Sequence, residues 1–392
     1  MKNLGIFLST EPNRGGVFQY TLSLLKALKD VSGEEYEVIA FYRDEVWLDI
    51  CNNLNIRSYK TSANTFLRGI TLVMKLFIPI KIRRCINKYV NPLGIALRKS
   101  KIDFCIYPAH EHFIYEIGIH SIATIHDLMH RYERRFPEVS ANGIFLAREK
   151  RFCSMCKWAD AILTDSEVGL RQVRESYGQY NPKIFALPYI APDYVYDDEM
   201  EINDEIINLQ HTLPAKYIFY PAQFWQHKNH INLIKAISSL IEMHPEIALV
   251  LVGSKKNGYE KVEEYIKEYG LGNRVIILGY VSNNAMIYLY KHARALVMPT
   301  FFGPTNIPQL EAFHLGCPVS TSNIYGIPDQ VGDAALLFDP NSVDEIAECI
   351  DRLWTDDELC KVLIEKGKQQ SENWGQKQFN KRLKLIISSI AK

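Results

Sequence analysis

Short apolar runs alternate with longer stretches of helical periodicity along almost the whole chain, and this alternation constrains the fold most. Successive parallel strands need a crossover between them, usually a helix, so the pattern predicts parallel sheets covered by helices. Strands are expected in the first half near 3–8, 37–41, 103–107, 121–125, 161–164 and 183–187. In the second half they are expected near 217–220, 247–252, 274–278, 295–298, 318–321 and 335–338.

Helical periodicity fills much of the space between these strands, in two sets that share one architecture. The expected helices lie near 17–30, 141–158, 167–177, 228–243, 258–269, 283–292, 307–315, 342–353, 356–369 and 375–391. The acidic, polar stretch 193–212 is expected to connect the two sets. With 392 residues, two domains are the natural expectation.

Composition excludes several classes of protein. The formal net charge is zero, so no global field favours nucleic acid as a partner. Met1 to Asn3 lead directly into an apolar run too short for a signal peptide, and no window offers the apolar length of a membrane-spanning helix. The eight cysteines are scattered, which predicts reduced thiols in a cytoplasmic protein.

One region has a strongly biased charge. Residues 51–100 carry ten Lys or Arg and no Asp or Glu. Within them, residues 64–90 interleave basic and apolar side chains, a pattern that suits an anionic membrane surface. The alternative is a pair of core helices whose exposed face is basic. We expect a protein peripheral to the inner face of the membrane.

The most specific motif runs from Pro299 to Val319. A buried strand is followed by a loop rich in Gly, Pro, Thr and Asn, and then by a helix that ends at Gly316. Asn306 and Gln309 have the spacing of a capping box, which predicts a helix starting near Ile307. Such a loop at a helix N-terminus is suited to anions, and Glu311 lies on the first turn of the helix.

This motif resembles the donor-sugar motif of the retaining glycosyltransferases of family 4, which have the glycosyltransferase B fold. That motif has two glutamates separated by eight positions. Glu311 matches the second glutamate, whereas Gly303 stands where the first would be. The resemblance covers nearly the whole chain. It implies an α/β fold of two facing Rossmann-like domains with parallel sheets, and a last helix that crosses back to the first domain.

The implied first domain, which binds the acceptor, covers residues 1–195 with 376–392 packed back on it. Its Gly15 and Gly16 stand where the family's loop touches the donor diphosphate, and Gly-Gly also lets the backbone come close to a ligand. His126 ends a strand and matches a His-Asp pair near the reactive end of the donor sugar. It is expected to form hydrogen bonds there rather than act as a general base.

The implied second domain, which binds the nucleotide sugar, covers residues 210–375. Lys228 matches a family cation that neutralises the diphosphate. Gln223 stands where a second cation, an arginine, is usual, and is expected to bind the donor through its side-chain N–H groups. Glu311 is expected to accept hydrogen bonds from the ribose, and Asn306 and Thr305 to compensate for the missing glutamate. The remaining expected donor contacts are Gly253, Tyr280, Val281 and Ile307. The catalytic set is expected to be His126, Lys228, Asn306 and Glu311.

Two further clusters have simpler interpretations. His110, Glu111 and His112 have side chains that metals bind, but no second half of a metal site accompanies them, so no metal is expected and acceptor lining is the alternative. Ser166 follows a strand, and an N-cap is favoured over a role in the site.

The sequence therefore predicts a retaining, metal-independent glycosyltransferase that needs no cofactor. The donor would be a GDP- or UDP-linked sugar, with a GDP-mannose-like donor slightly favoured. The acceptor would be a glycan or a lipid-linked glycan in the synthesis of a surface polysaccharide. Two alternatives stay open, an inactive nucleotide-binding scaffold and a sugar-nucleotide epimerase.

Overall fold

The computed structural model describes residues 1–12, 15–33, 35–61, 74, 77–196 and 201–390. It divides into two compact units. Unit 1 comprises Met1–Leu128, Phe145–Pro188 and Gln376–Lys392, and unit 2 comprises Met129–Ile144 and Tyr189–Gly375. The C-terminal residues from Gln376 thus belong with the first half of the chain. Residues 129–144 belong with the second half, although they lie far upstream of it.

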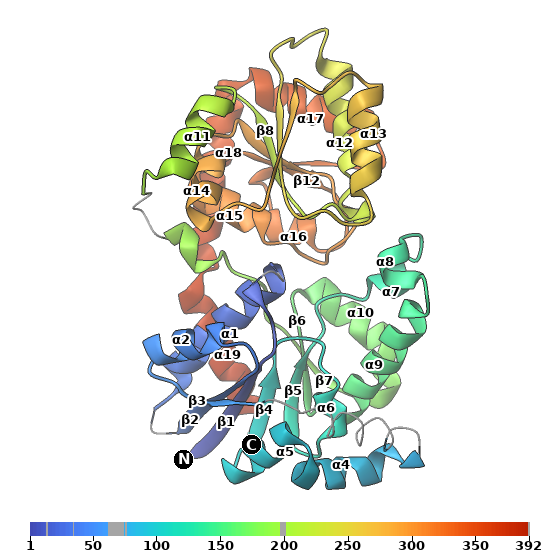
Figure 1. The fold of residues 1–392 in the computed structure, drawn as a ribbon, viewed down its shortest axis with the longest axis vertical. Helices are drawn as coiled ribbons and strands as arrows, with labels where there is room; N and C mark the ends of the chain where they lie inside the picture. Colours follow the sequence, from blue (N-terminus) through green and yellow to red (C-terminus); the bar gives the residue numbers. More distant parts are fainter. Residues whose placement is uncertain (13–14, 34, 62–73, 75–76, 197–200, 391–392) are drawn as a thin grey trace. The chain divides into compact units, whose positions relative to one another are not determined.

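Unit 1 is built on one parallel sheet (Figure 1). Its strands are β1 (Lys2–Leu8), β2 (Tyr36–Tyr42), β3 (Arg57–Lys60), β4 (Phe104–Tyr107), β5 (His120–Thr124), β6 (Ala161–Thr164) and β7 (Lys183–Ala186). Within the described residues their order is β3-β2-β1-β4-β5-β6-β7. Every neighbouring pair is parallel, and the buried runs of β1, β4, β5 and β6 explain the apolar signal in the sequence.

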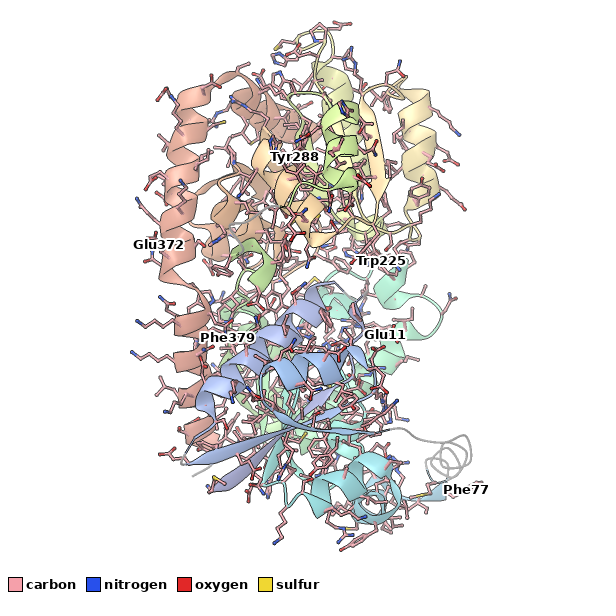
Figure 2. All side chains as sticks on the ribbon, turned by 60° about the vertical axis from the view of Figure 1, so that its left-hand side comes forward. Glu11, Phe77, Trp225, Tyr288, Glu372 and Phe379 are labelled. Carbon is pink, nitrogen blue, oxygen red and sulfur yellow. The ribbon has the colours of Figure 1, made fainter. Side chains whose placement is uncertain are left out.

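Helices connect these strands. They are α1 (Gly16–Val31), α2 (Val46–Asn53), α4 (Ile80–Val90), α5 (Pro92–Lys99), α6 (Phe113–Glu116), α9 (Ile144–Trp158), α10 (Glu167–Tyr177) and α19 (Gln376–Ile390). Short 3-10 turns add η2 (Gly178–Tyr180). Phe379 of α19 is fully buried and lies beside α1, where its ring meets Tyr20 at 6.3 Å between centroids (Figure 2). Burial of this apolar contact explains why the last helix returns to unit 1.

Unit 2 contains a second parallel sheet. Its strands are β8 (Ile218–Pro221), β9 (Leu249–Val252), β10 (Val275–Gly279), β11 (Ala295–Met298), β12 (Val319–Ser322) and β13 (Ala335–Phe338). In the part of the chain that the structure describes, their order is β10-β9-β8-β11-β12-β13. The sheet order reverses direction between β8 and β11, and ligands of open α/β sheets bind beyond the carboxyl ends of strands at such a point.

Helices cover both faces of the second sheet (Figure 1). One face packs against α12 (His230–Leu240), α13 (Tyr259–Glu268) and α17 (Val343–Thr355). The other packs against α11 (Asp204–Thr212), α14 (Asn283–His292), α15 (Pro308–Leu315) and α16 (Ile327–Val331). The rest of the unit consists of α7 (Met129–Tyr132), α8 (Pro137–Ser140), α18 (Asp357–Asn373) and the 3-10 turns η3 (Asp193–Tyr196) and η4 (Gln226–Lys228).

The predicted α/β class with two parallel sheets is confirmed. The stretch 193–212, expected to connect the two sets, contains η3 and α11. One local expectation needs correction. Helix α15 starts at Pro308, and its N-cap Ile307 forms no side-chain cap bond. The predicted capping box at Asn306 and Gln309 is therefore wrong. The side-chain amide of Gln309 instead donates to the Thr321 hydroxyl at 3.1 Å.

Candidate functional site

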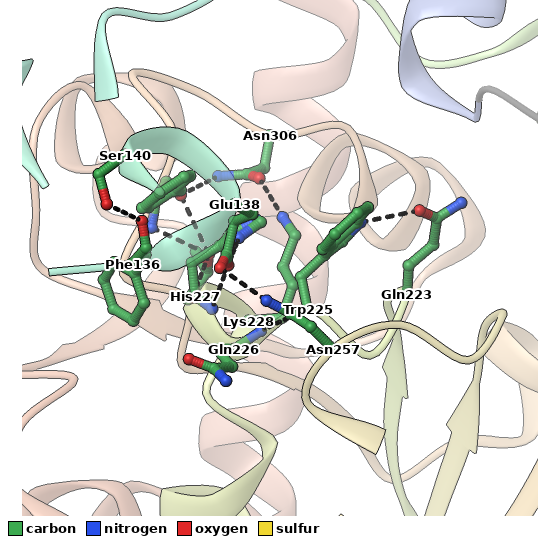
Figure 3. Close-up of polar contacts among 12 residues, drawn as sticks. Phe136, Glu138, Ser140, Gln223, Trp225, Gln226, His227, Lys228, Asn257 and Asn306 are labelled. Atoms are coloured by element: carbon green, nitrogen blue, oxygen red, sulfur yellow. Dashed lines mark hydrogen bonds and ion pairs between the residues drawn. The ribbon is translucent and has the colours of Figure 1, made fainter. Parts of the chain in front are cut away.

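Two loops at the carboxyl ends of β8 and β11 meet in unit 2 and bring Lys228 to Asn306. The Lys228 Nζ lies 3.3 Å from the Asn306 Oδ1 (Figure 3). Asn229 fixes this geometry, because its left-handed backbone ends η4 and its side-chain amide donates to the Pro299 carbonyl at 2.9 Å. The backbone N–H of Phe301 also donates to the His227 carbonyl, at 2.8 Å. The two loops are thus tied together beside Lys228.

Asn306 occupies the space that a side chain at position 303 would need. Gly303 has φ of +116°, and a Cβ built on it would lie 2.4 Å from the Asn306 Nδ2. Gln330 holds the Asn306 backbone from both sides: it accepts from the N–H at 3.0 Å and donates to the carbonyl at 2.6 Å. The missing glutamate at 303 and the asparagine at 306 therefore form one coupled arrangement.

Glu311 lies in a buried cradle of two tyrosine hydroxyls. Tyr194 donates to its Oε1 at 2.7 Å and Tyr290 to its Oε2 at 2.6 Å. Burial raises the Glu311 pKa, and the two hydroxyl bonds oppose that rise. Each carboxylate oxygen has a second acceptor direction, so these bonds are compatible with an additional hydroxyl donor. The expected ribose contact of Glu311 stays a prediction.

Gln223, in the loop after β8, has a neutral side chain. Its side-chain oxygen accepts from the Trp225 indole N–H at 3.0 Å, which fixes the orientation of the amide (Figure 3). Gly253 is required where it stands, since its φ is +153° and a Cβ there would lie 2.2 Å from the Ala222 carbonyl oxygen. It lets the end of β9 approach the loop after β8.

The remaining residues expected at the donor follow neighbouring strands. Thr305 and Ile307 are buried next to Asn306, and the Ile307 carbonyl accepts from Leu310 and Glu311 at the start of α15. Tyr280 and Val281 follow β10, and the Tyr280 side chain is 81% exposed. The structure thus places all of these residues in loops that follow strands of the second sheet.

A segment that sequence reasoning left out also reaches these loops. Glu138 of α8 accepts from the backbone N–H of His227 at 3.0 Å, from its ring Nδ1 at 2.6 Å and from the Asn257 amide at 3.0 Å (Figure 3). Burial by itself would raise the Glu138 pKa, but these bonds prevail and lower the pKa to about 2. The Glu138 carboxyl is therefore ionised at neutral pH.

His126 of unit 1 lies beside His110. Its ring Nε2 donates to the Pro108 carbonyl at 2.8 Å, and its backbone N–H donates to the His110 Nε2 at 3.1 Å. Burial lowers the His126 pKa to about 4, so the ring is neutral at neutral pH. Asp127 forms an ion pair with Arg148. A neutral ring already bonded to a carbonyl suits a hydrogen-bonding role.

Gly15 and Gly16 stand at the start of α1, and Gly15 is its N-cap with φ of 55°. The first N–H groups of a helix have no acceptor within the helix, and the expected contact of this turn with the donor diphosphate stays a prediction. Ser166 accepts from the Gly169 N–H at 3.0 Å, which confirms the predicted N-cap of α10.

Comparison with known proteins shows what the second unit is similar to. Residues 202–370 match the family model described as glycosyl transferases group 1. The chain is 26% identical to the O-antigen chain mannosyltransferase B of Escherichia coli over 380 residues, which are 94% of this chain and 95% of that protein.

Solved structures show the fold of the whole chain. Sucrose-phosphate synthase from Thermosynechococcus elongatus aligns with a TM-score of 0.74 at 16% identity, over 100% of this chain and 99% of that one. The Anabaena protein HepE, crystallised with UDP and glucose, aligns with a TM-score of 0.73 at 13% identity, over 99% and 100% of the two chains. The predicted glycosyltransferase B fold is thereby confirmed.

The sequence also predicted two absences. Among the described residues, no group of three or more His, Cys, Asp or Glu side chains is arranged to hold a metal ion, and this includes His110, Glu111 and His112. No helix in the described part of the chain is both long and apolar enough to cross a membrane.

The basic region 64–90 lies partly outside the described residues, which omit 62–73, 75 and 76. Of the rest, Arg83 Nε and Nη2 lie 3.1 and 3.2 Å from the Glu116 oxygens. The Arg84 guanidinium donates to two backbone carbonyls of α6 and lies 4.7 Å from the centre of the Trp158 ring. These two arginines bind within unit 1, and the membrane contact expected of residues 64–90 stays a prediction.

Proposed function

We propose that this chain is a retaining glycosyltransferase, which transfers a sugar from a nucleotide-diphosphate sugar to a glycan or lipid-linked glycan. The observation that carries the proposal is the placement of Lys228 and Asn306 on the loops after β8 and β11, with Glu311 on helix α15 directly after the second loop. A cation, amide groups and a carboxylate are the chemistry that a diphosphate, a sugar and a ribose would each require.

The reaction would be driven by stabilising the leaving group. The bond between the anomeric carbon and the diphosphate oxygen breaks, and its electron pair leaves with the diphosphate. Lys228 would neutralise the charge that develops there, without a bound metal. The acceptor hydroxyl then bonds the anomeric carbon on the same face, and its proton passes to the departing phosphate oxygen.

His126 would contribute a neutral hydrogen-bonding group near the donor sugar. A ring with a pKa of about 4 is a poor base at neutral pH, which favours this role over general-base catalysis. The expected contacts of Gly15 and Gly16 with the diphosphate are part of the same proposal.

The sugar proposed is mannose, and the product a surface polysaccharide. Support comes from the similarity, over nearly the whole chain, to an O-antigen chain mannosyltransferase. GDP-mannose is therefore the first donor to test. UDP sugars come next, because a protein of the same fold was crystallised with UDP and glucose. The enzyme would work in the cytoplasm at the inner face of the membrane.

A panel of nucleotide sugars tests the proposal. The purified chain is incubated with each donor and with p-nitrophenyl α-mannoside as acceptor, and release of the nucleoside diphosphate is measured. We expect release from one donor only, with a product whose anomeric configuration, read by nuclear magnetic resonance, matches that of the donor. An inverted product would contradict the retaining mechanism.

An inactive nucleotide-binding scaffold is the second candidate. Gly303 and Gln223 favour it, because each lacks a charge that the resembled motif carries. It predicts binding of GDP or UDP by calorimetry, without release from any donor of the panel in the presence of membrane-extracted glycolipid acceptors.

A further inference from the structure

The segment 129–144 packs onto the donor loops of unit 2. The ring of Phe136 lies 5.4 Å from that of Phe301 and 5.2 Å from that of Phe302, measured between centroids. At another point of the segment, the Tyr325 hydroxyl donates to Glu133 at 2.8 Å. Aromatic contacts of this kind stabilise the packing through buried area and favourable ring geometry. They attach the segment to the loops.

Glu138 is the charged contact of this segment with the loop that carries Lys228. Its side chain is 7% exposed and that of His227 is 12% exposed, so the pair is shielded from water. The carboxylate binds both the ring and the backbone N–H of His227. It therefore fixes the turn Gln226–Lys228 as well as one side chain.

The His227 ring is held from a second direction. It stacks on Phe302 with 3.9 Å between centroids and 14° between planes. The residue that follows it is Lys228, whose backbone N–H donates to the Trp225 carbonyl at 3.0 Å. Loss of the carboxylate would remove the shared acceptor of the ring and of the backbone N–H, and so would loosen the turn that carries Lys228.

The ion pair of Glu138 and His227 also affects the charge near Lys228. A buried carboxylate would repel a diphosphate unless a protonated partner neutralised it. The charged and titratable groups beside His227 are Glu138, Lys228 and His230, and the His230 pKa is lowered by burial to about 3, so that ring is neutral. An ionised carboxylate 2.6 Å from Nδ1 favours the imidazolium form of His227.

We propose that Glu138 is a positioning residue of the donor site, which acts through His227 to fix the Lys228 turn and to keep the His227 ring protonated. The Glu138–His227 pair then adds no net negative charge beside the diphosphate, and Lys228 remains the cation of the loop. This inference rests on the proposed function, since it assigns the loop to the donor diphosphate. It adds a residue from the first half of the sequence to the proposed donor site.

The variant Glu138→Gln tests the inference, with Glu138→Asp as the variant that keeps the charge and Tyr325→Phe as the matched control. Tyr325→Phe removes another polar contact of the same segment without touching His227. With the donor found by the panel, Glu138→Gln should lower kcat at least about tenfold while KM for the donor changes less than about threefold. Glu138→Asp should recover part of the rate.

The pH dependence of the rate distinguishes a role of Glu138 in positioning His227 from a role in attaching the segment to the loops. Without its carboxylate, His227 should lose its proton at a lower pH than in the wild type, so the rate of Glu138→Gln should fall as pH rises through a range in which the wild-type ring stays protonated. The wild type and Tyr325→Phe should not show this fall. If Tyr325→Phe and Glu138→Gln lose activity equally and with the same pH profile, then Glu138 only attaches the segment and the inference is wrong.

A measurement without any donor keeps this test independent of the proposed function. The ring nitrogens of His227 are followed by nuclear magnetic resonance during a pH titration of the wild type and of Glu138→Gln, with thermal unfolding to check that both are folded. We expect the wild-type ring to stay protonated to a higher pH. Identical titrations would overturn the inference, whereas a panel without turnover would overturn only the proposed function.

Discussion

At the scale of single residues, positions 223 and 303 in the loops after β8 and β11 lack the charges that the resembled motif carries. Gln223 bonds Trp225, and Asn306 fills the space above Gly303. Lys228 is then the cation that the loops offer directly, with its Nζ 3.3 Å from the Asn306 oxygen. A single cation in such a place should carry much of the stabilisation of the leaving group.

We therefore predict that Lys228→Ala lowers kcat at least about tenfold, because a cation at a departing diphosphate acts most strongly in the transition state. Initial rates at saturating donor measure this effect. The control is Lys291→Ala, which removes an exposed lysine at the end of α14. A near-normal rate for Lys228→Ala at saturating donor would contradict the assignment.

Gly303 and Asn306 should be energetically coupled. We predict that Gly303→Ala destabilises the protein by about 1–3 kcal/mol, since φ of +116° strains any L side chain and the new Cβ would meet the Asn306 amide. Adding Asn306→Gly should relieve the clash but not the backbone strain. Urea unfolding of both single variants and the double variant measures the coupling.

The matched control is Gly178→Ala, where φ is −58° and a Cβ would have nothing within 4 Å. It should change the free energy of unfolding by less than about 0.5 kcal/mol. Additive effects of Gly303→Ala and Asn306→Gly would show that the two positions are independent.

The sequence predicted which candidate site residues follow strands. It did not predict the side chains that form hydrogen bonds with them. Lys228 and Asn306 both follow apolar runs, and carboxyl ends of parallel strands meet at one edge. Glu138 is 89 positions from His227, and Tyr194 is 117 positions from Glu311. Nothing in local periodicity marks such pairs, because they arise only when the segments pack.

At the scale of elements, the sequence predicted those strands whose buried positions form an apolar run. The runs of β1, β6, β9 and β11 are buried and apolar, and all were expected. Strand β3 was missed because its four residues, Arg57–Lys60, are polar and largely exposed at the sheet edge. Helix α15 was found, but its start was assigned to a cap that tertiary contacts of Asn306 and Gln309 replace.

Helix α4 provides a test of the membrane proposal. Its neighbour Phe77 is 79% exposed and labelled at the edge of Figure 2, and Ile82 and Tyr89 are 52% and 63% exposed. Because Arg83 and Arg84 are bound within unit 1, the exposed apolar side chains should contribute most to binding. We predict that Ile82→Ser with Tyr89→Ser weakens binding to phosphatidylglycerol vesicles, measured by co-sedimentation.

The control for this prediction is Leu146→Ser on α9, which removes a side chain that is 71% exposed in the same unit. Binding of the wild type should also weaken at high salt, because attraction of lysines to an anionic surface is screened. Equal binding of the double variant, the control and the wild type would favour α4 as an ordinary surface helix.

At the scale of the whole molecule, each unit contains a neutral histidine in its interior. His126 of unit 1 has a pKa of about 4 and His230 of unit 2 has a pKa of about 3, both lowered mainly by burial. Neither ring can take a proton without a loss of favourable packing and solvation. Both units should therefore respond to acid through their histidines as well as their carboxylates.

The last prediction concerns that response. Below the ordinary histidine pKa of about 6.5, the unfolded chain binds protons that the folded units do not, so stability falls as pH falls from there toward the folded values. His230→Gln removes one such site and should reduce the loss of stability by up to about 1.4 kcal/mol per pH unit. The measurement is the urea midpoint at pH of about 7 and 5.5, with His211→Gln, an exposed position, as control. If the midpoints of His230→Gln and the wild type shift equally between the two pH values, the buried ring does not cause the acid sensitivity of unit 2.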